Sequence, residues 1–278
     1  MEREPVTPLD PPAAWLGGKS RLAARIIAVI EALPHACYAE PFLGMGGVFL
    51  RRPRRPKVEV INDLNGDIVT FFRVIKHHPD EFRRQAEWLL SSRREFDDLR
   101  AQPVSALTDI QRAVRFIYLQ RLAFGGQVGG VFGVSINGPS RLRYDDLMAM
   151  AGALHQRLKL VVIENLSWAD FLPRYDAADV LFYLDPPYMG GEGDYGKGLF
   201  APADFARMAE MLAAIQGGFV LSLNDCAAAR RIFAAFAMAE LEMTYTVARA
   251  AAPAKVRELL ISNRDLAGLA APGDLFGP

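Results

Sequence analysis

Apolar runs of strand length alternate with amphipathic runs of helical period along most of the chain. Short apolar runs bounded by glycine, proline or charged residues predict buried strands, whereas apolar residues at three- and four-residue spacing predict helices. Strands are predicted at 37–40, 58–61, 160–164, 180–184, 219–223, 243–247 and 259–262. Helices are predicted at 21–33, 68–76, 144–157 and 202–215, with a helical region from 79 to 122 that is interrupted at 103 and a further helix ending near 236. The alternation predicts one α/β sheet with a helical insertion.

The pattern changes between 124 and 138, where glycines are interleaved with Val and Phe, and where Arg141 and Arg143 follow. Such a stretch predicts a hairpin or a flexible loop. Two interpretations stay open for it. It is either an ordinary surface hairpin or a part of the protein that reaches into a nucleic-acid duplex.

The strand at 180–184 ends in Asp185-Pro186-Pro187-Tyr188. Proline cannot donate to a sheet ladder, so the strand must stop here. In an open α/β sheet, ligands bind outside the carboxyl ends of the strands. Asp185, the carbonyl of Pro186 and the ring of Tyr188 would then form two acceptors beside a stacking surface, which suits a planar ring with an exocyclic amine. The alternative is a plain strand end with a proline turn.

Two earlier strands also end in residues suited to a ligand. Gly44 and Gly46 follow the strand at 37–40 and allow a tight turn with close approach of the backbone. A dinucleotide fingerprint would need glycine where Phe49 stands, which disfavours NAD or FAD. Asp63 follows the strand at 58–61 and is placed to accept from a ribose diol, although Asp63 or Asn65 could simply cap the next helix.

The segment Gly17-Gly18-Lys19-Ser20 resembles part of a phosphate-binding loop, but that motif needs glycine where Ala13 stands, and no predicted strand precedes it. What remains is a glycine turn at a helix start that carries a lysine. Such a lysine is suited to hold a ligand carboxylate.

Composition adds few constraints. The two cysteines and four histidines indicate no disulfide framework and no metal site. No apolar run reaches the ~18 residues of a membrane span, and the first twelve residues lack the apolar core of a signal peptide. These features predict a soluble, cytoplasmic protein. The net charge is zero, so arginine clusters neither support nor exclude a DNA partner.

Six motifs in order resemble those of the Dam-type DNA adenine N6-methyltransferases. They are Trp-Leu-Gly-Gly-Lys at 15–19, Glu-Pro-Phe-Leu-Gly-Met-Gly at 40–46, Asn-Asp-Leu-Asn-Gly-Asp at 62–67, Asp170-Phe171, Asp-Pro-Pro-Tyr at 185–188 and the segment 255–263. The resemblance implies a Rossmann-like methyltransferase sheet, mostly parallel with about seven strands and with helices on both faces. It implies a catalytic domain at 13–80 and 158–265, an inserted target-recognition region at 81–157, and flexible tails at 1–12 and 266–278.

The resemblance also implies S-adenosylmethionine as cofactor. The implied binding residues are Trp15, Lys19, Glu40, Phe42, Gly44, Gly46, Asp63, Asp170 and Phe171. Lys19 would face the methionine carboxylate, Asp63 the ribose, and Asp170 with Phe171 the adenine end.

The implied substrate is a flipped adenine in double-stranded DNA. Asp185 and the carbonyl of Pro186 would hold the two N6 hydrogens while Tyr188 stacks on the ring. Methyl transfer would be direct, without a covalent enzyme intermediate and without a metal. The implied DNA-contacting residues are Arg121, Arg141, Arg143, Lys255 and Arg257.

The resemblance is incomplete in one place and leaves alternatives open. Residues 124–138 carry few side chains able to read base edges, so relaxed specificity is expected. The alternative functions are methylation of RNA adenine or of cytosine N4, and a non-catalytic DNA-binding module. Family members are bacterial or phage-encoded, and act alone or with a restriction partner. The terminal Asp274-Leu275-Phe276 resembles peptides that bind the bacterial sliding clamp, or is part of a plain tail.

Overall fold

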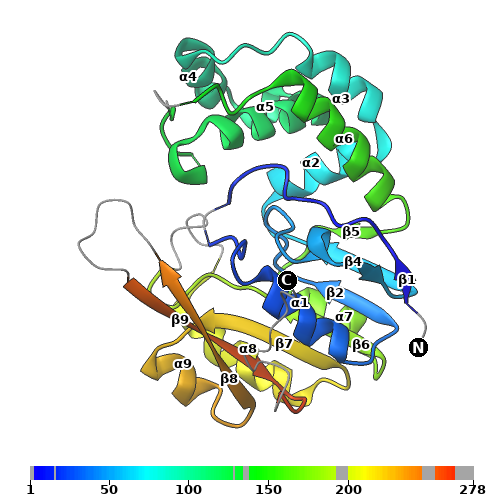
Figure 1. Cartoon of the computed structure of the whole chain (residues 1–278), viewed down its shortest axis with the longest axis vertical. Coiled ribbons are helices and arrows are strands. Elements are labelled where there is room, and N and C mark those ends of the chain that lie inside the picture. Colours follow the sequence, from blue (N-terminus) through cyan, green and yellow to red (C-terminus); the bar gives the residue numbers. More distant parts are fainter. Residues whose placement is uncertain are drawn as a thin grey trace, which may run out of the picture.

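A seven-stranded mixed sheet forms the centre of the computed structural model, which describes residues 3–15, 17–127, 129–133, 138–191, 200–245 and 254–266 (Figure 1). The strands lie in the order β5 (Val162–Glu164), β4 (Val58–Asn62), β2 (Cys37–Glu40), β6 (Val180–Leu184), β7 (Gly218–Asn224), β9 (Ala254–Ser262) and β8 (Ala237–Tyr245). The first five are parallel, and β9 runs antiparallel to both β7 and β8. The predicted mostly parallel sheet is therefore confirmed.

Both faces of the sheet are covered, as the uninterrupted apolar run of β6 requires. Leu181 and Tyr183 face a core that also contains Ile26 and Ile30 of α1 (Ala23–Ala32). Phe182 and Leu184 face a second core. The helices of this second core are α7 (Trp168–Tyr175), α8 (Pro202–Ala214) and α9 (Ala227–Ile232).

The chain between β4 and β5 is helical, as predicted for 68–76, 79–122 and 144–157. It contains α2 (Gly66–His77), α3 (Pro79–Ala86), α4 (Arg93–Ala101), α5 (Asp109–Leu122) and α6 (Tyr144–Leu158). Figure 1 shows these helices as a group at one end of the sheet. Asn65 caps α2, and Thr108 begins α5 with a capping box to Gln111. Phe71, Phe82 and Phe116 pack together inside the group.

The described part of the glycine-rich stretch after α5 folds back on itself like the predicted hairpin. Ala123 and Phe132 form an antiparallel bridge, and the Phe124 amide donates to the Val131 carbonyl at 2.8 Å. Positions 128 and 134–137 lie outside the described residues.

The predicted flexible tail at 1–12 is wrong for residues 3–12. A short strand β1 (Glu4–Pro5) pairs with β3 (Arg54–Arg55), and the Leu9 amide donates to the Leu50 carbonyl at 2.8 Å. The N-terminal segment therefore lies against residues 50–55. At the other end, Leu266 is buried in the core, while 267–278 with the predicted clamp motif lie outside the described residues.

Three element predictions also differ from the structure. The strand predicted at 243–247 is β8, which spans Ala237–Tyr245. The segment between the strands predicted at 160–164 and 180–184, for which no helix was predicted, forms helix α7, whose start Ser167 caps. The last strand begins at Ala254 and not at Leu259, because it pairs along its whole length with β8. Among the described helices, none combines the length and apolar character needed to cross a bilayer.

Candidate active site

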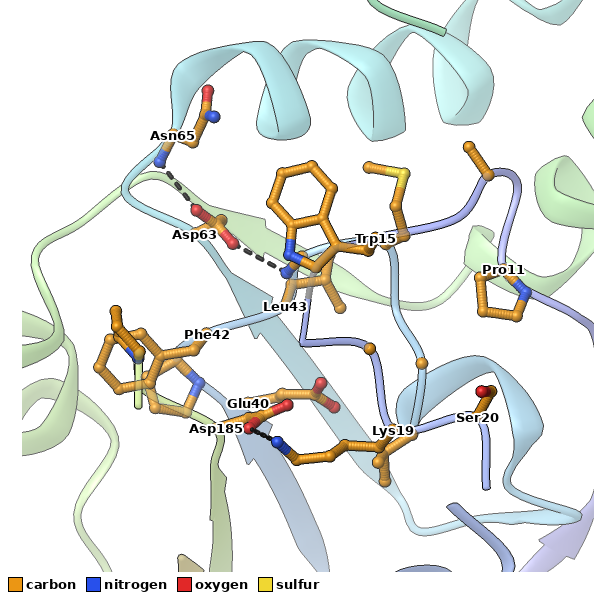
Figure 2. A pocket seen from close by; sticks show the side chains of 18 of the residues that line it. Pro11, Trp15, Lys19, Ser20, Glu40, Phe42, Leu43, Asp63, Asn65 and Asp185 are labelled. Atoms are coloured by element: carbon orange, nitrogen blue, oxygen red, sulfur yellow. Dashed lines mark hydrogen bonds and ion pairs between the residues drawn. The ribbon is translucent and has the colours of Figure 1, made fainter. Parts of the chain in front are cut away.

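A cavity of about 340 Å³ lies at the carboxyl ends of β2, β4 and β6. Aromatic side chains line it, among them Trp15, Phe42, Trp168 and Phe200. Four carboxylates of the described residues line it as well, Asp10, Glu40, Asp63 and Asp185. Figure 2 shows Asp63 near Trp15 in one part of the cavity, and Glu40 beside Asp185 and Lys19 in another. The predicted site residues Trp15, Lys19, Glu40, Phe42, Gly44, Asp63 and Asp185 are thus brought together.

The loop after β2 requires glycine at two positions. Gly44 has φ +53°, and a Cβ there would lie 2.9 Å from the indole Nε1 of Trp15. Gly46 has φ +73°, and its Cβ would lie 2.9 Å from Cγ of Leu50. Side chains at these positions would be strained and would collide with their neighbours. The loop therefore brings bare backbone to the cavity at Gly44.

Asp63 binds the backbone of this loop and of the next turn. One carboxylate oxygen accepts from the Gly44 amide at 2.8 Å and the other from the Asn65 amide at 2.8 Å (Figure 2). Burial raises the pKa of Asp63 to about 6, although hydrogen bonds from backbone amides oppose the rise. Asn65 caps α2, so the helix-capping interpretation holds for Asn65, while Asp63 lines the cavity.

Glu40 is almost completely buried at the end of β2. The Tyr38 hydroxyl donates to its Oε2 at 2.6 Å. Burial raises the pKa of Glu40 well above its ordinary value, and the nearby Asp185 carboxylate adds to the rise.

Asp185 stands at the end of β6 with its side chain 22% exposed. Its Oδ1 lies 2.7 Å from Nζ of Lys19 and accepts from the Ser222 hydroxyl at 3.1 Å. Burial raises the pKa of Asp185 to about 6; Lys19 opposes this rise and Glu258 adds to it. Asp185 is therefore ionised at neutral pH, and Lys19 and Ser222 fix the position of its carboxylate.

Lys19 is buried and contacts three side chains. Its Nζ lies 2.7 Å from Asp185 Oδ1, 3.0 Å from Glu258 Oε1 and 3.1 Å from the Tyr188 hydroxyl. Burial opposes its charge, but Asp185 and Glu258 raise the pKa of Lys19 well above its ordinary value. The sequence suggested that this ammonium faces a ligand carboxylate; in the structure it faces protein carboxylates.

Tyr188 lies against this group without lining the cavity itself, and Pro187 lines it in place of Pro186. The Tyr188 hydroxyl donates to Glu258 Oε2 at 2.8 Å, and Nζ of Lys19 lies 4.4 Å from the ring centroid. The Asn224 side chain accepts from the Met189 amide at 2.9 Å and so holds the backbone that follows Tyr188.

Sequence reasoning missed Glu258, Ser222 and Asn224 as members of the site. Asn224 ends a predicted strand at the same sheet edge as Asp185, which was a usable signal. Ser222 and Glu258 lie within strands, and their proximity to Asp185 depends on the order β6-β7-β9. Glu258 precedes the strand predicted at 259–262 and follows the charged residues Lys255 and Arg257, so nothing in the sequence singled it out.

Asp170 and Phe171 do not line the cavity. Asp170 accepts from the Ser167 hydroxyl at 2.6 Å in the first turn of α7, and Phe171 is fully buried against Tyr175 and Phe182. Trp168, from the same turn, lines the cavity instead. The first turn of α7 therefore contributes Trp168 to the cavity, and not the predicted residues Asp170 and Phe171.

The predicted DNA-contacting arginines of the insertion have intramolecular partners. Arg121 donates to the Pro12 carbonyl at 2.9 Å, Arg141 donates to the Ala123 carbonyl at 3.4 Å, and Arg143 pairs with Asp146 at 3.4 Å. Arg257 is exposed on β9, and the side chain of Lys255 lies outside the described residues. Arg121 is half-buried and connects α5 to the N-terminal segment.

Comparison with known proteins gives a consistent picture. A family model described as "D12 class N6 adenine-specific DNA methyltransferase" matches residues 15–247. The Type II methyltransferase M1.LlaDCHI of Lactococcus lactis subsp. cremoris is 26% identical over 92% of this chain and 95% of its own length. The DNA adenine methylases of Serratia marcescens and Escherichia coli K12 are 28% and 27% identical over 63% of this chain. The chain spans 65% and 63% of the length of these two methylases.

Proposed function

Because the chain belongs to the D12 class N6 adenine-specific DNA methyltransferase family, we propose that its cavity binds S-adenosylmethionine and that it methylates N6 of an adenine in duplex DNA. The observation that carries this proposal is the position of Asp185. A largely buried, ionised acceptor stands at the end of β6, next to Tyr188 and at the wall of an aromatic cavity. An amine held by Asp185 would lie beside whatever the cavity binds.

The residues of the cavity fit this cofactor. Trp15, Phe42 and Trp168 offer faces for a purine ring, and the lone pairs of Asp63 that its two backbone amides leave open suit ribose hydroxyls. Glu40 and Asp185 supply carboxylates for a cation. Gly44, which has no Cβ, lets the ligand approach the backbone. The cavity of about 340 Å³ is within the usual size range of small-molecule sites.

When bound, S-adenosylmethionine would supply an electrophilic methyl group. The N6 lone pair of adenine is delocalised into the ring, so the amine is a weak nucleophile. Asp185 and the Pro186 carbonyl would accept from its two hydrogens, favour a tetrahedral nitrogen, and stabilise the positive charge that develops on it as the methyl–sulfur bond breaks. The surplus proton of the methylated nitrogen would leave through the Asp185 carboxylate. Most of the acceleration would then come from positioning and from fixed acceptors.

The target base must leave the helix to reach Asp185. Unstacking costs a few kcal/mol, and stacking on an aromatic ring returns about 1–3 kcal/mol. Tyr188 would provide that ring, and its hydroxyl is already held by Glu258. The hydrogen bonds of the site would contribute the remainder.

We assign the contact with the duplex to the insertion and its glycine-rich loop. Phe124 and Val131 lie side by side there, 67% and 63% exposed, on a turn with Gly125 at φ +67°. We take this exposed apolar pair as the part of the loop that meets the duplex, where apolar side chains can pack against bases. Few side chains able to read base edges accompany them, so the preference for flanking sequence should be loose.

The test is transfer of tritiated methyl from S-adenosylmethionine to mixed-sequence duplex DNA, followed by chromatography of the nucleosides. Label in N6-methyladenine is the expected result. Label in N4-methylcytosine, or label on RNA but not on DNA, would replace the proposal by another substrate. Cofactor binding without transfer to any nucleic acid would favour a binding module.

A further inference from the structure

Glu258 is a buried carboxylate in the middle of strand β9, with 1% of its surface exposed. It lies opposite Asn224 of β7 and Leu241 of β8 in the antiparallel register. Directly opposed residues point to the same face of a sheet. The face therefore carries Ser222 and Asn224 of β7 beside Glu258, at the edge where Asp185 ends β6.

Both oxygens of Glu258 point to residues of the site. Oε2 accepts from the Tyr188 hydroxyl at 2.8 Å, and Oε1 lies 3.0 Å from Nζ of Lys19. Oε1 makes no hydrogen bond of good geometry despite this ion pair. Burying a carboxylate is costly unless it is paired, and an apolar residue would pack into a strand at lower cost. The position of Glu258 is thus explained by its partners and not by the packing of β9.

Lys19 connects Glu258 to Asp185. Its Nζ contacts both carboxylates and the Tyr188 hydroxyl, so four side chains form one cluster. The cluster holds one ammonium and two carboxylates, which leaves one negative charge in excess. This negative charge would stabilise methyl transfer, in which a positively charged donor reacts with an amine that itself becomes positively charged.

We propose that Glu258 is a positioning residue for methyl transfer, which holds the Tyr188 ring for the target base and keeps Lys19 on Asp185. The inference rests on the proposed function. Glu258 touches neither substrate nor cofactor in this role; it acts through Tyr188 and Lys19. Without it, the Tyr188 hydroxyl loses its acceptor and keeps only the contact with Lys19, and Lys19 loses one of its two carboxylate partners.

The charge of Glu258 also affects the acceptor. Among the described residues, five titratable groups surround Asp185. They are Lys19 in the turn before α1, Glu40 on β2, Tyr183 on β6, Tyr188 in the turn after β6, and Glu258 on β9. Glu258 raises the pKa of Asp185 by like-charge repulsion. Removing that charge should lower this pKa, so the acidic limb of the rate profile should move to lower pH.

The first test compares Glu258→Gln with Glu240→Gln in the full chain. Glutamine keeps the shape and can still accept from Tyr188, but it lacks the charge that holds Lys19. Glu240 lies on the neighbouring strand β8, where it is half-exposed and pairs with Arg230, so it is the matched control. We expect Glu258→Gln to lower kcat roughly 10- to 100-fold with little change in cofactor affinity, as for loss of a positioning partner. Glu240→Gln should match the wild type.

The second readout does not depend on turnover. A duplex with 2-aminopurine at the target position reports unstacking of the base by fluorescence, and it is measured with the protein in the absence of cofactor. Weaker fluorescence enhancement by Glu258→Gln, together with an acidic limb moved to lower pH, supports the inference. Wild-type fluorescence with wild-type kcat overturns it, as does a fall in kcat matched by equal losses of cofactor affinity and thermal stability.

Tyr188→Phe keeps the test decisive if Glu258→Gln does not fold. It retains the ring but removes the hydroxyl that Glu258 holds, so a similar drop in kcat is expected. Where both single variants fold, the double variant should be no slower than the slower single variant; multiplied losses would overturn the coupling. A wild-type protein that transfers no methyl group would contradict the proposed function, whereas an active wild type with an equally active Glu258→Gln contradicts only this inference.

Discussion

Asp185 combines burial with fixed hydrogen-bond partners, and this decides at which pH it can act. Its carboxylate must be ionised to accept from an amine, and burial raises its pKa to about 6. Below that pH it becomes protonated and loses acceptor capacity toward the amine. The rate of methyl transfer at saturating substrates should therefore fall as pH is lowered through about 6.

The pH prediction is checked by single-turnover rates between pH 5 and 8. The sulfonium charge of the cofactor does not change in this range, and its α-amino group titrates only near the upper end, so a limb near pH 6 reports on the protein and the base. A rate that is flat down to pH 5 would contradict the assignment of Asp185 as the acceptor.

Gly44 tests the wall of the cavity at a single position. Its φ of +53° and the 2.9 Å approach of a Cβ to the Trp15 indole predict both strain and collision for Gly44→Ala. We expect a loss of stability of about 1–2 kcal/mol and a cofactor affinity reduced at least tenfold, because Trp15 would be displaced. Calorimetric binding without DNA measures the affinity.

Gly125→Ala is the matched control for Gly44→Ala. Gly125 has φ +67°, but a Cβ at this position would meet no atom within 4 Å. The Gly125→Ala variant should lose about as much stability as Gly44→Ala but bind the cofactor with wild-type affinity. Equal losses of affinity in both variants would show that general destabilisation, and not the Trp15 contact, is responsible.

At the scale of elements, helix α5 supports the segment that forms one wall of the cavity. Gln120 donates to the carbonyls of Ala14 and Gly126, and Arg121 donates to the carbonyl of Pro12. Ala14 and the neighbours of Pro12 line the cavity. The insertion is therefore joined to the cofactor wall by direct hydrogen bonds.

Arg121→Met should weaken this support. Losing the bond to Pro12 is expected to reduce cofactor affinity by about 0.5–2 kcal/mol. Arg115→Met is a close control, because Arg115 lies on the same helix but donates to the carbonyls of Leu99 and Arg100 in α4. Its cofactor affinity should not change.

The Arg121 variant also tests the expected DNA contact. If Arg121 binds a phosphate, Arg121→Met should lower the salt dependence of DNA binding by about one unit of slope. An unchanged slope with weaker cofactor binding is the outcome that the hydrogen bond to Pro12 predicts. An unchanged cofactor affinity would contradict the proposed support.

The elements most accurately predicted from sequence are those with the sharpest boundaries. The strands at 37–40 and 180–184 match the structure because each is a short apolar run that ends at Glu-Pro or Asp-Pro. Helix α7 was missed because it is short and contains Pro173. The start of β9 was missed because its pairing with β8, and not its composition, extends it to Ala254.

The same distinction applies to the residues of the site: those next to sharp element boundaries could be predicted, and those that depend on strand pairing could not. Residues that follow strands at one sheet edge, such as Asp63 and Asp185, could be grouped from sequence because parallel strands end together. Glu258 could not be grouped with them, because β9 enters the sheet between β7 and β8, out of sequence order. The partners of Lys19 depend on that order and were not predictable.

At the scale of the whole molecule, a buried ionic network joins the insertion to the sheet. Arg157 at the end of α6 pairs with Glu59 of β4 at 2.5 Å, and Glu59 also contacts Arg52 at 3.4 Å. Arg52 pairs with Glu31 of α1 and donates to Nε2 of His35 at 3.2 Å. The donation from Arg52 requires a neutral His35, whose Nδ1 faces the Leu33 carbonyl.

His35 should make the fold sensitive to acid. Burial, and then the charge of Arg52, lower the pKa of His35 from 6.5 to about 4. A lowered folded-state pKa means that stability is present above pH 6.5 and is lost as pH falls toward 4, by roughly 3 kcal/mol in total. Urea unfolding across this range should show the loss in the wild type and a smaller one in His35→Gln.

His78→Gln is the control for the acid response, because His78 is exposed. It should follow the wild type at every pH. The comparison between variants matters because Asp63 and Asp185, with raised pKa values, act in the opposite direction. Identical pH dependence in wild type and His35→Gln would contradict the burial of a neutral histidine.

The role of Asp185 is tested most directly by single-turnover methyl transfer to duplex DNA, compared between the wild type and Asp185→Asn, with cofactor affinity measured in parallel. Asparagine keeps the size of Asp185 but offers one acceptor oxygen and no charge. The predicted result is N6-methyladenine as the labelled nucleoside, with a rate at least about 100-fold lower in Asp185→Asn and cofactor affinity retained. Equal rates in the two proteins would show that Asp185 is not the acceptor, and label on another atom would show that N6 of adenine is not the methylated position.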